Sequence, residues 1–459
     1  MGFRVEKKVK SWKKVLLTGT GVCVLLTGGY GYREFGMVKA ETKAGTESLD
    51  HGSIQGEASL EDLQEQGTSE EDFKAEEEGG ENVGPGVSGS GETEPERETE
   101  REVGPGVANE PETEEEPELE SVTISLAGDC SIGTLSIHGY EGTFREMYDK
   151  YGPSYFFKNV KSVFEADDMT LVNFEGVLTN SNKKVPKEFN IKGKPEYIQV
   201  LPEGDIDAVS FGNNHRIDYG DQGIADTITA FNSIGMPYAY DENIGIFETE
   251  RGVKIGFVSV DVVYGGRQVE NYLQSGFERL RQENVNLILA CCHWGIESTY
   301  YPESYQLELG HKCIDWGADL VVGCHPHVLQ GVEKYKGKYI LYSLGNFCFG
   351  GNRNPKDKNT MIAQAKFTLE EGSPKGEAEM TLIPCTISSV NHRNDYCPTI
   401  AQGEKRTEII QKLNGYSSQF GVTVGEDGKV SGPEEAKEQP KETQGETETA
   451  ETSAEGSGE

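Results

Sequence analysis

The amino-acid sequence predicts an α/β domain between about residues 121 and 420. Apolar runs of strand length alternate there with amphipathic segments of helical period, which is typical of α/β proteins. The strands are almost continuously apolar, as expected when both faces of a sheet are covered. Polar residues concentrate where these strands end, and open α/β sheets place their sites at that edge.

Charge separates this domain from its flanking segments. The chain has 459 residues and a formal net charge of −35, but the acidic residues are concentrated in 41–120 and 421–459. These two segments are rich in Glu, Gly, Thr, Ser and Pro and carry few large apolar side chains, so we expect a disordered linker and a disordered tail. No large basic cluster follows the N-terminus, and this argues against nucleic acid as a partner.

The first 40 residues have the composition of a membrane-targeting segment. Six Lys and Arg residues precede an uncharged, mostly apolar run of about 18 residues at 15–32, which is marginal for a spanning helix. The sequence favours an uncleaved anchor, while a signal peptide cleaved after Ala40 stays open. In both cases the basic end faces the cytoplasm and the main domain lies outside the cell.

The elements of the domain follow in order. Strands are predicted at 122–129, 169–176, 206–215, 254–261, 285–297, 319–322 and 338–350, with late antiparallel strands at 361–370 and 378–388. Helical segments are predicted at 144–164, broken near Pro153, and at 221–234, 272–281 and 305–316. Gly235 and Gly317 stand just past two of these helices, where a left-handed residue usually ends a helix. Cys385 and Cys397 could pair, but their spacing leaves this open.

Two histidines follow the short strand at 319–322. Gly323 allows a sharp turn, and Pro326 stiffens the loop that presents His325 and His327. This spacing can offer two ring nitrogens to one metal ion or one to each of two ions. The pair alone is weak evidence, because two nearby histidines are often packed or exposed without a ligand.

Other predicted strands end in similar residues. The residues at these ends are Asp129, Glu175, Asn214, His215, His293, His325 and His327. Each has a structural explanation when taken singly, such as a helix cap, a turn residue or a core histidine, but the joint pattern indicates a site. Carboxylates, an amide oxygen and neutral imidazoles suit one or two divalent ions of Mn, Fe or Zn. Two such ions could activate a water molecule and bind both the attacking and the leaving oxygen of a phosphoryl displacement.

The order of the motifs resembles the CapA family of capsule and poly-γ-glutamate synthesis proteins. Its domain is similar to calcineurin-like metallophosphoesterases. The resemblance spans about 122–350 and is specific only as an ordered set. The motifs are Gly128-Asp129, Asn173-x-Glu175, Asn213-Asn214-His215 with Asp218-Tyr219-Gly220, His293-Trp294-Gly295-x-Glu297, Gly317-Ala318-Asp319 through His325-Pro326-His327, and Tyr342-Ser343-Leu344-Gly345-Asn346-Phe347. The resemblance implies a layered α/β/β/α sandwich of metallophosphoesterase type.

The resemblance also implies roles for individual residues. It implies that the metal ligands are Asp129, Glu175, Asn214, His293, His325 and His327. His215 would polarise or protonate the leaving oxygen beside Asn214, and Arg216 could hold an anionic substrate or be an exposed loop cation. Phosphoesterases usually begin with Asp-x-His, whereas Cys130 and Ser131 follow Asp129 here. One imidazole is therefore missing, which puts full occupancy of one metal position in question.

Two functions from different classes follow. The first is a membrane-anchored extracellular component of capsule or poly-γ-glutamate synthesis or export, whose partners are an anionic polymer, the membrane and other membrane-bound synthesis subunits. The alternative is a metal-dependent hydrolase at the cell surface, either a phosphoesterase or an amidase that cleaves the polymer. A binding module that has kept only the scaffold is a third possibility, and the sequence leaves open whether the site is catalytically active.

Overall fold

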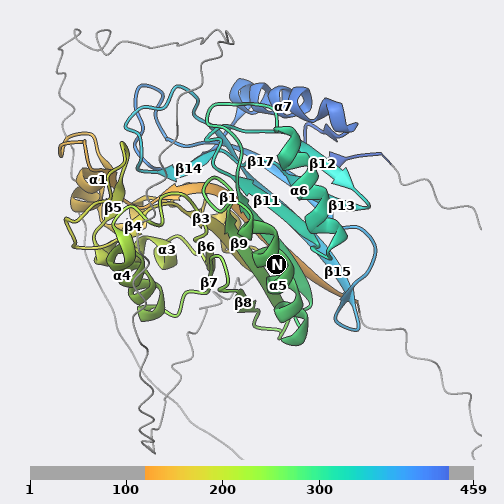
Figure 1. The fold of residues 1–459 in the computed structure, drawn as a ribbon. Coiled ribbons are helices and arrows are strands. Elements are labelled where there is room, and N and C mark those ends of the chain that lie inside the picture. Colours follow the sequence, from red (N-terminus) through yellow and green to blue (C-terminus); the bar gives the residue numbers. More distant parts are fainter. Residues whose placement is uncertain (1–118, 434–459) are drawn as a thin grey trace, which may run out of the picture. The chain divides into compact units, whose positions relative to one another are not determined.

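The computed structural model describes residues 119–433. The predicted anchor at 1–40, nearly all of the acidic linker and residues 434–459 of the tail lie outside this range. No helix within 119–433 combines the length and the apolar content needed to cross a membrane. The predicted α/β class is confirmed, since both helices and two large mixed sheets are present (Figure 1).

The first sheet contains the N-terminal strand of the domain. Its order is β18-β17-β15-β1-β3-β6-β7, and β14 and β16 pair with β1 and β15. The bounds are β1 Leu119–Ser131, β3 Met169–Phe174, β6 Ala208–Ser210, β7 Tyr238–Ala239, β14 Asn346–Phe349, β15 Asn359–Glu370, β16 Ser373–Pro374, β17 Glu379–Thr386 and β18 Thr399–Ile400. β1, β3, β6, β7 and β14 run parallel, whereas β15 pairs antiparallel with both β1 and β17, as predicted for the late strands.

The second sheet contains the strand that precedes the two histidines. Its order is β12-β13-β11-β10-β9-β8. The bounds are β8 Gly245–Glu248, β9 Lys254–Asp261, β10 Leu287–His293, β11 Leu320–Cys324, β12 Val332–Tyr335 and β13 Lys338–Leu341. The four inner strands β9, β10, β11 and β13 are parallel, so their carboxyl ends meet at one edge.

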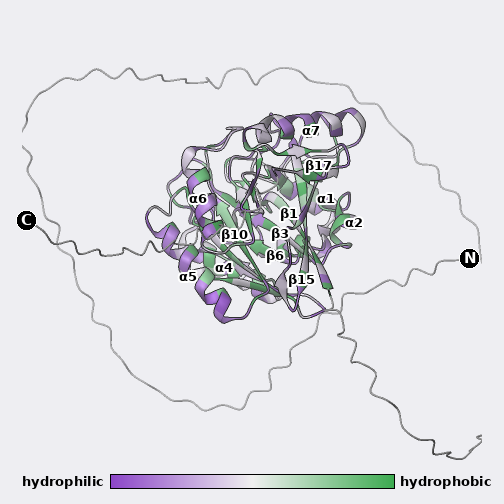
Figure 2. Cartoon of the chain, turned by 90° about the vertical axis from the view of Figure 1, so that its right-hand side faces the viewer, coloured by the Kyte–Doolittle hydropathy of each residue, from purple (hydrophilic) through white to green (hydrophobic). Residues whose placement is uncertain are grey.

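The two sheets pack face to face. One core cluster joins residues of β1, β3 and β15 to residues of β9, β10 and β11, including Leu126, Leu171 and Leu289. Figure 2 shows apolar strands inside the domain and hydrophilic outer faces on the surrounding helices. This arrangement explains why the strands read as continuous apolar runs, because both faces of each sheet are covered.

Helices cover the outer faces. α1 Phe144–Tyr151, α2 Lys161–Phe164, α3 Val200–Glu203 and α4 Gly220–Ser233 pack on the first sheet, and α5 Gln268–Gln282 and α6 Ser304–Asp315 pack on the second. α7 Gly403–Ser417 contributes to the core between the sheets through Ile409 and Leu413. Gly235 and Gly317 follow α4 and α6 with φ of 68° and 104°, the left-handed conformation expected after a helix.

Short elements complete the domain. A small sheet has the order β2-β5-β4, and β19 pairs with β20. Their bounds are β2 Thr134–Leu135, β4 Val177–Leu178, β5 Ile191–Gly193, β19 Thr423–Val424 and β20 Val430–Ser431, with 3-10 helices at Pro153–Tyr155, Pro195–Gln199 and Ser418–Phe420. Val422 and Val424 join the core between the two large sheets.

One sequence expectation needs correction, and one alternative that the sequence left open is decided. The apolar run 338–350 is not one strand: β13 pairs in the second sheet and β14 in the first. Gly345, with φ of 71°, lies where the chain passes between the sheets, and a run of apolar residues does not show such a change of sheet. Cys385 and Cys397 are free and buried, and each thiol lies against a backbone carbonyl, of Ile383 and Tyr155 respectively.

Gly128 marks a close approach of two backbones. A Cβ atom at this position would lie 1.9 Å from the carbonyl oxygen of Gly345. We expect Gly128→Ala to lower the free energy of unfolding by about 2–4 kcal/mol, because the contact is with backbone that cannot move aside easily. Urea denaturation of the full chain measures this change.

Gly139→Ala is the matched control. No atom lies within 4 Å of a Cβ at Gly139, so we expect a change within about 0.5 kcal/mol. Equal stability of the two variants would show that the approach of β1 to Gly345 is not tight.

Candidate metal centre

Strand register brings the predicted site residues to one edge of the domain. In the first sheet Asp129 is in register with both Asn173 of β3 and Asn346 of β14. In the second sheet His293 of β10 is in register with Cys324, the residue before His325. Because the strands are parallel, the residues that follow them enter the same space from two sides.

Glu175 occupies the centre of the cluster. Its side chain is fully buried, and neither carboxylate oxygen has a hydrogen-bond partner among residues 119–433. Its Oε1 lies 3.7 Å from Nε2 of His215, 3.9 Å from Nε2 of His293 and 3.7 Å from Nε2 of His327. These distances are too long for hydrogen bonds, but two ligand atoms of one ion can be up to about 4.4 Å apart.

Asp129 holds the loop that follows β11. His327 Nδ1 lies 3.0 Å from Asp129 Oδ2 as an ion pair, and the backbone N–H of His325 lies 3.4 Å from both oxygens of Asp129. His325 and His327 have φ of 96° and 58°, which is uncommon for residues with a side chain. Strained backbone of this kind often marks a functional site.

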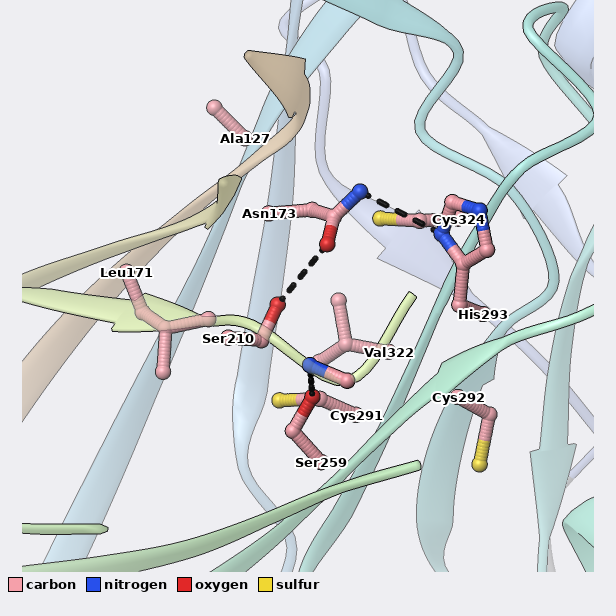
Figure 3. A pocket seen from close by; sticks show the side chains of 11 residues that line it. Ala127, Leu171, Asn173, Ser210, Ser259, Cys291, Cys292, His293, Val322 and Cys324 are labelled. Atoms are coloured by element: carbon pink, nitrogen blue, oxygen red, sulfur yellow. Dashed lines mark hydrogen bonds between the residues drawn. The ribbon is translucent and has the colours of Figure 1, made fainter. Parts of the chain in front are cut away.

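Asn214 and His293 meet on the other side of Glu175. His293 Nε2 lies 3.1 Å from Asn214 Oδ1, and the Nδ2 group of Asn173 lies 3.3 Å from His293 Nδ1 and donates to Asp129 Oδ1 at 2.8 Å. Figure 3 shows Asn173 reaching between Ser210 and His293. The cavity drawn there measures only about 10 Å³, room for about one water, so a substrate has to approach from outside it.

Burial and charge set the protonation of these groups. Burial raises the pKa of Glu175 well above its usual value. Burial also lowers the pKa of His293, of His215 and of His325, the last to about 4, so these imidazoles are neutral at pH 7. Burial opposes the charged form of His327 too, but Glu175 and Asp129 outweigh it and raise the pKa of His327 to about 10. The buried carboxylates therefore require positive charge beside them.

His215 belongs to a hydrogen-bonded group. Its Nδ1 lies 2.7 Å from Oδ2 of Asp218, a fully buried carboxylate, which fixes the ring orientation. Lys187 pairs with the other oxygen of Asp218 at 2.7 Å and donates to the backbone carbonyl of Asn214 at 2.9 Å. The Nε2 atom of His215 therefore faces Glu175 while its other nitrogen is held from behind.

Arg216 does not join the cluster. Its guanidinium pairs with Asp241 at 2.5 Å and lies over the Tyr240 ring at 4.9 Å from the ring centre. The alternative of an exposed loop cation does not describe this paired and partly buried position, and the role in holding an anionic substrate stays a prediction.

Two groups of side chains could hold a metal ion. One comprises Asp129, Glu175 and His327, and the other comprises Glu297, His325 and His327. His327 is common to both, so the two groups adjoin. The oxygens of Glu175 and the buried Nδ1 of His325, which have no partner within the described part of the chain, are donor atoms that fit a divalent cation. The six predicted ligands thus lie together, and their binding of a metal stays a prediction.

Sequence reasoning missed five contributors. Glu297, Asn173, Asp218 and Asn346 lie within the recognised motifs but were given no role, and Lys187 lies in a loop with no such signal. Asn346 holds His327 from behind, since its Oδ1 is 3.0 Å from His327 Nδ1 and its Nδ2 donates to the His327 carbonyl. Ser131, where the Asp-x-His pattern would place histidine, has a buried hydroxyl without a partner among residues 119–433.

Asn173 positions two candidate ligands at once. We expect Asn173→Ala to weaken the affinity for Mn²⁺ by about 10–100-fold, because Asp129 and His293 both lose the group that orients them. Isothermal titration calorimetry of the full chain measures this affinity.

Ser210→Ala serves as the control for the Asn173 substitution. The Ser210 hydroxyl donates to Oδ1 of Asn173 at 3.3 Å, whereas Asp129 and His293 contact Nδ2 of the same amide. The affinity for Mn²⁺ should therefore change less than threefold. Unchanged affinity in Asn173→Ala would rule out the positioning role.

Comparison with known proteins identifies relatives for the segment that carries the cluster. The model of the family described as "Bacterial capsule synthesis protein PGA_cap" matches residues 123–351. The chain is 28% identical over 293 residues to "Capsule biosynthesis protein CapA" of Bacillus anthracis, covering 56% of this chain and 69% of that protein. It is also 28% identical over 308 residues to "PGA biosynthesis protein CapA" of Bacillus subtilis, covering 62% and 77%.

Solved structures are more distant. A 5'-nucleotidase from Candida albicans aligns with 65% of this chain and 57% of its own, at 9% identity and a TM-score of 0.35. That score is too low to show a common fold.

Proposed function

The chain belongs, through residues 123–351, to the family of bacterial capsule synthesis proteins, and on this premise we propose that it acts in the synthesis or export of an anionic surface polymer such as poly-γ-glutamate. It does so as a single-pass membrane protein with its main domain outside the cell. Two relatives named for capsule and PGA biosynthesis support the polymer. The basic N-terminus and apolar run at 15–32 support the anchor.

The buried cluster around Glu175 is the observation that carries a role beyond scaffolding. A carboxylate with no hydrogen-bond partner among residues 119–433, surrounded by three imidazole nitrogens, is costly without a cation. Asp129, Glu175, Asn214, His293, His325 and His327 would hold one or two Mn, Fe or Zn ions, with Glu297 as a further ligand. When bound, such an ion supplies a Lewis acid at the polymer's acyl or phosphoryl groups.

Deletion of residues 121–420 with retention of the N-terminal segment tests the proposed role. In a polymer-producing strain, this deletion should abolish surface polymer, measured as glutamate released by acid hydrolysis of the polymer extracted from washed cells. A chain carrying Glu175→Gln should fail to restore the polymer, whereas Glu333→Gln, remote from the cluster, should restore it. Normal polymer in the deletion strain contradicts the proposal.

A metal-dependent hydrolase is the second candidate, favoured by the hydrogen-bonded pair of His215 and Asp218 beside Glu175. A histidine fixed by a carboxylate is suited to accept a proton and pass it on during hydrolysis. The full chain loaded with Mn²⁺ should then hydrolyse a phosphodiester or a γ-glutamyl oligomer, and His325→Ala should lose this turnover. Equal turnover in the two proteins eliminates the hydrolase.

A further inference from the structure

A second cavity lies apart from the Glu175 cluster. It has a volume of about 390 Å³ and is walled by the segment before β15, the loop after β17 and one face of α7. Four lysines line it, at 356, 358, 405 and 412, against two acidic residues, Asp357 and Glu408. The lysines therefore outnumber the acidic residues that line this concave surface.

The acidic residues do not neutralise all four lysines. Glu408 accepts from Lys405 at 3.0 Å and from Lys412 at 2.8 Å, because the three residues share one face of α7. Asp357 is occupied by the Tyr300 hydroxyl at 3.0 Å and by the backbone N–H of Asn359 at 2.9 Å. Lys356 and Lys358 make no ion pair within residues 119–433. Two ammonium groups are therefore available to a ligand.

A buried amide lines the same cavity. Asn359 is 4% exposed, and its side-chain oxygen has no hydrogen-bond partner among residues 119–433. Such a group is uncommon in a folded protein and points to a partner outside the chain. Because the amide can present either its oxygen or its nitrogen, it can bond the N–H or the carbonyl of a peptide-like ligand.

The cavity adjoins the loop that carries a candidate metal ligand. Tyr300, which bonds Asp357 at the cavity, follows Glu297 by three residues, a chain length of roughly 10 Å at most. Tyr300 also stacks on Tyr416 of α7, with ring centres 5.4 Å apart. The cavity therefore lies within a short length of chain of the loop that carries Glu297.

We infer that this lysine-lined cavity binds a segment of a polymer that carries carboxylates and amide groups, such as an oligomer of γ-linked glutamate. Lys356 and Lys358 pair with its carboxylates, and the amide of Asn359 bonds its backbone. The lysines alone would pair with the carboxylates of a polypeptide or with the phosphates of a polyphosphate. The buried amide of Asn359 favours the polypeptide, because it can bond peptide groups. This inference rests on the proposed role in polymer synthesis and assigns the polymer a place on the domain.

Fluorescence anisotropy with a labelled γ-glutamyl heptamer, in EDTA to exclude bound metal, tests the cavity. The full chain should bind the heptamer, and Lys356→Glu combined with Lys358→Glu should weaken binding at least tenfold. Uncharged Gln at both positions should have an intermediate effect. The wild-type affinity should also fall as salt rises from 50 to 300 mM, since exposed charges are screened.

Lys366→Glu combined with Lys429→Glu is the matched control. It makes the same change in net charge at two exposed lysines that do not line the cavity, and binding should stay within twofold of wild type. Equal weakening in both double variants would show a response to net charge and overturn the site. An absence of binding by the wild type would also overturn it, while leaving the surface-polymer test of the proposed function unaffected.

Polyphosphate of the same charge gives the remaining outcome. If it binds more tightly than the heptamer and loses affinity in the Lys356 and Lys358 variant, the cavity takes phosphates and the assignment to a polypeptide is wrong. Weaker binding of polyphosphate supports the assignment.

Discussion

Glu175→Gln is expected to abolish the stabilisation of the protein by Mn²⁺ while leaving the metal-free protein at least as stable as wild type. The carboxylate is fully buried without a hydrogen-bond donor among residues 119–433, and burial raises its pKa, so its charged form is disfavoured in the absence of a metal ion. An uncharged amide of the same shape removes this cost and also removes the central ligand. Thermal unfolding with and without Mn²⁺ measures both effects.

The size of the effect follows from mass action. A metal at 100 times its dissociation constant stabilises the native state by about 2.7 kcal/mol, and this increment should disappear in Glu175→Gln. Glu333→Gln is the control, because Glu333 accepts from Tyr342 at 2.5 Å and from His311 at 2.9 Å, with no contact to the cluster. It should lower stability yet keep the response to Mn²⁺. A Glu175→Gln protein that retains the full response would contradict a metal at this position.

His215→Ala is expected to lower the rate of any hydrolysis by about 10²–10⁴-fold without loss of metal affinity. His215 Nε2 faces Glu175, while Nδ1 is held by Asp218, so the ring is placed to transfer a proton. Because it is absent from both groups of candidate ligands, its removal should leave Mn²⁺ bound. Single-turnover kinetics and calorimetry on the same preparation separate the two quantities.

His311→Ala controls for the loss of an imidazole paired with a carboxylate. His311 bonds Glu333 at 2.9 Å and stacks on Tyr335, away from the cluster, so turnover should stay within about twofold. If His215→Ala loses rate and metal together, the residue acts as a ligand, and its assignment to proton transfer is wrong.

Parallel register explains how much of the cluster could be predicted from sequence. Asp129, Glu175, Asn214, His215, His293 and the two histidines after β11 each follow an apolar strand, and parallel pairing brings such positions together whatever the details of packing. The strand over 254–261 matches β9, and 221–234 matches α4 within a residue at each end. Local patterns suffice for these elements.

Contacts that depend on packing between elements could not be predicted. Arg216 pairs with Asp241, and Lys187 pairs with Asp218 from a loop without regular structure. Neither ion pair could be predicted, because both depend on the tertiary arrangement. The division of 338–350 between two sheets was missed for the same reason, since an apolar strand reads alike in either sheet. Glu297 was visible in its motif, but only the structure sets it beside His325 and His327.

The division of the candidate ligands between the two sheets has a consequence for metal selection. Oxygen donors follow strands of the first sheet, at Asp129, Glu175 and Asn214, whereas the imidazoles follow strands of the second, at His293, His325 and His327. Before the sheets dock, one half of the chain offers the oxygen ligands Asp129, Glu175 and Asn214, and the other offers the three imidazoles with Glu297. The complete set of candidate ligands therefore exists only in the folded domain, so we expect the choice of metal to follow folding and not to direct it.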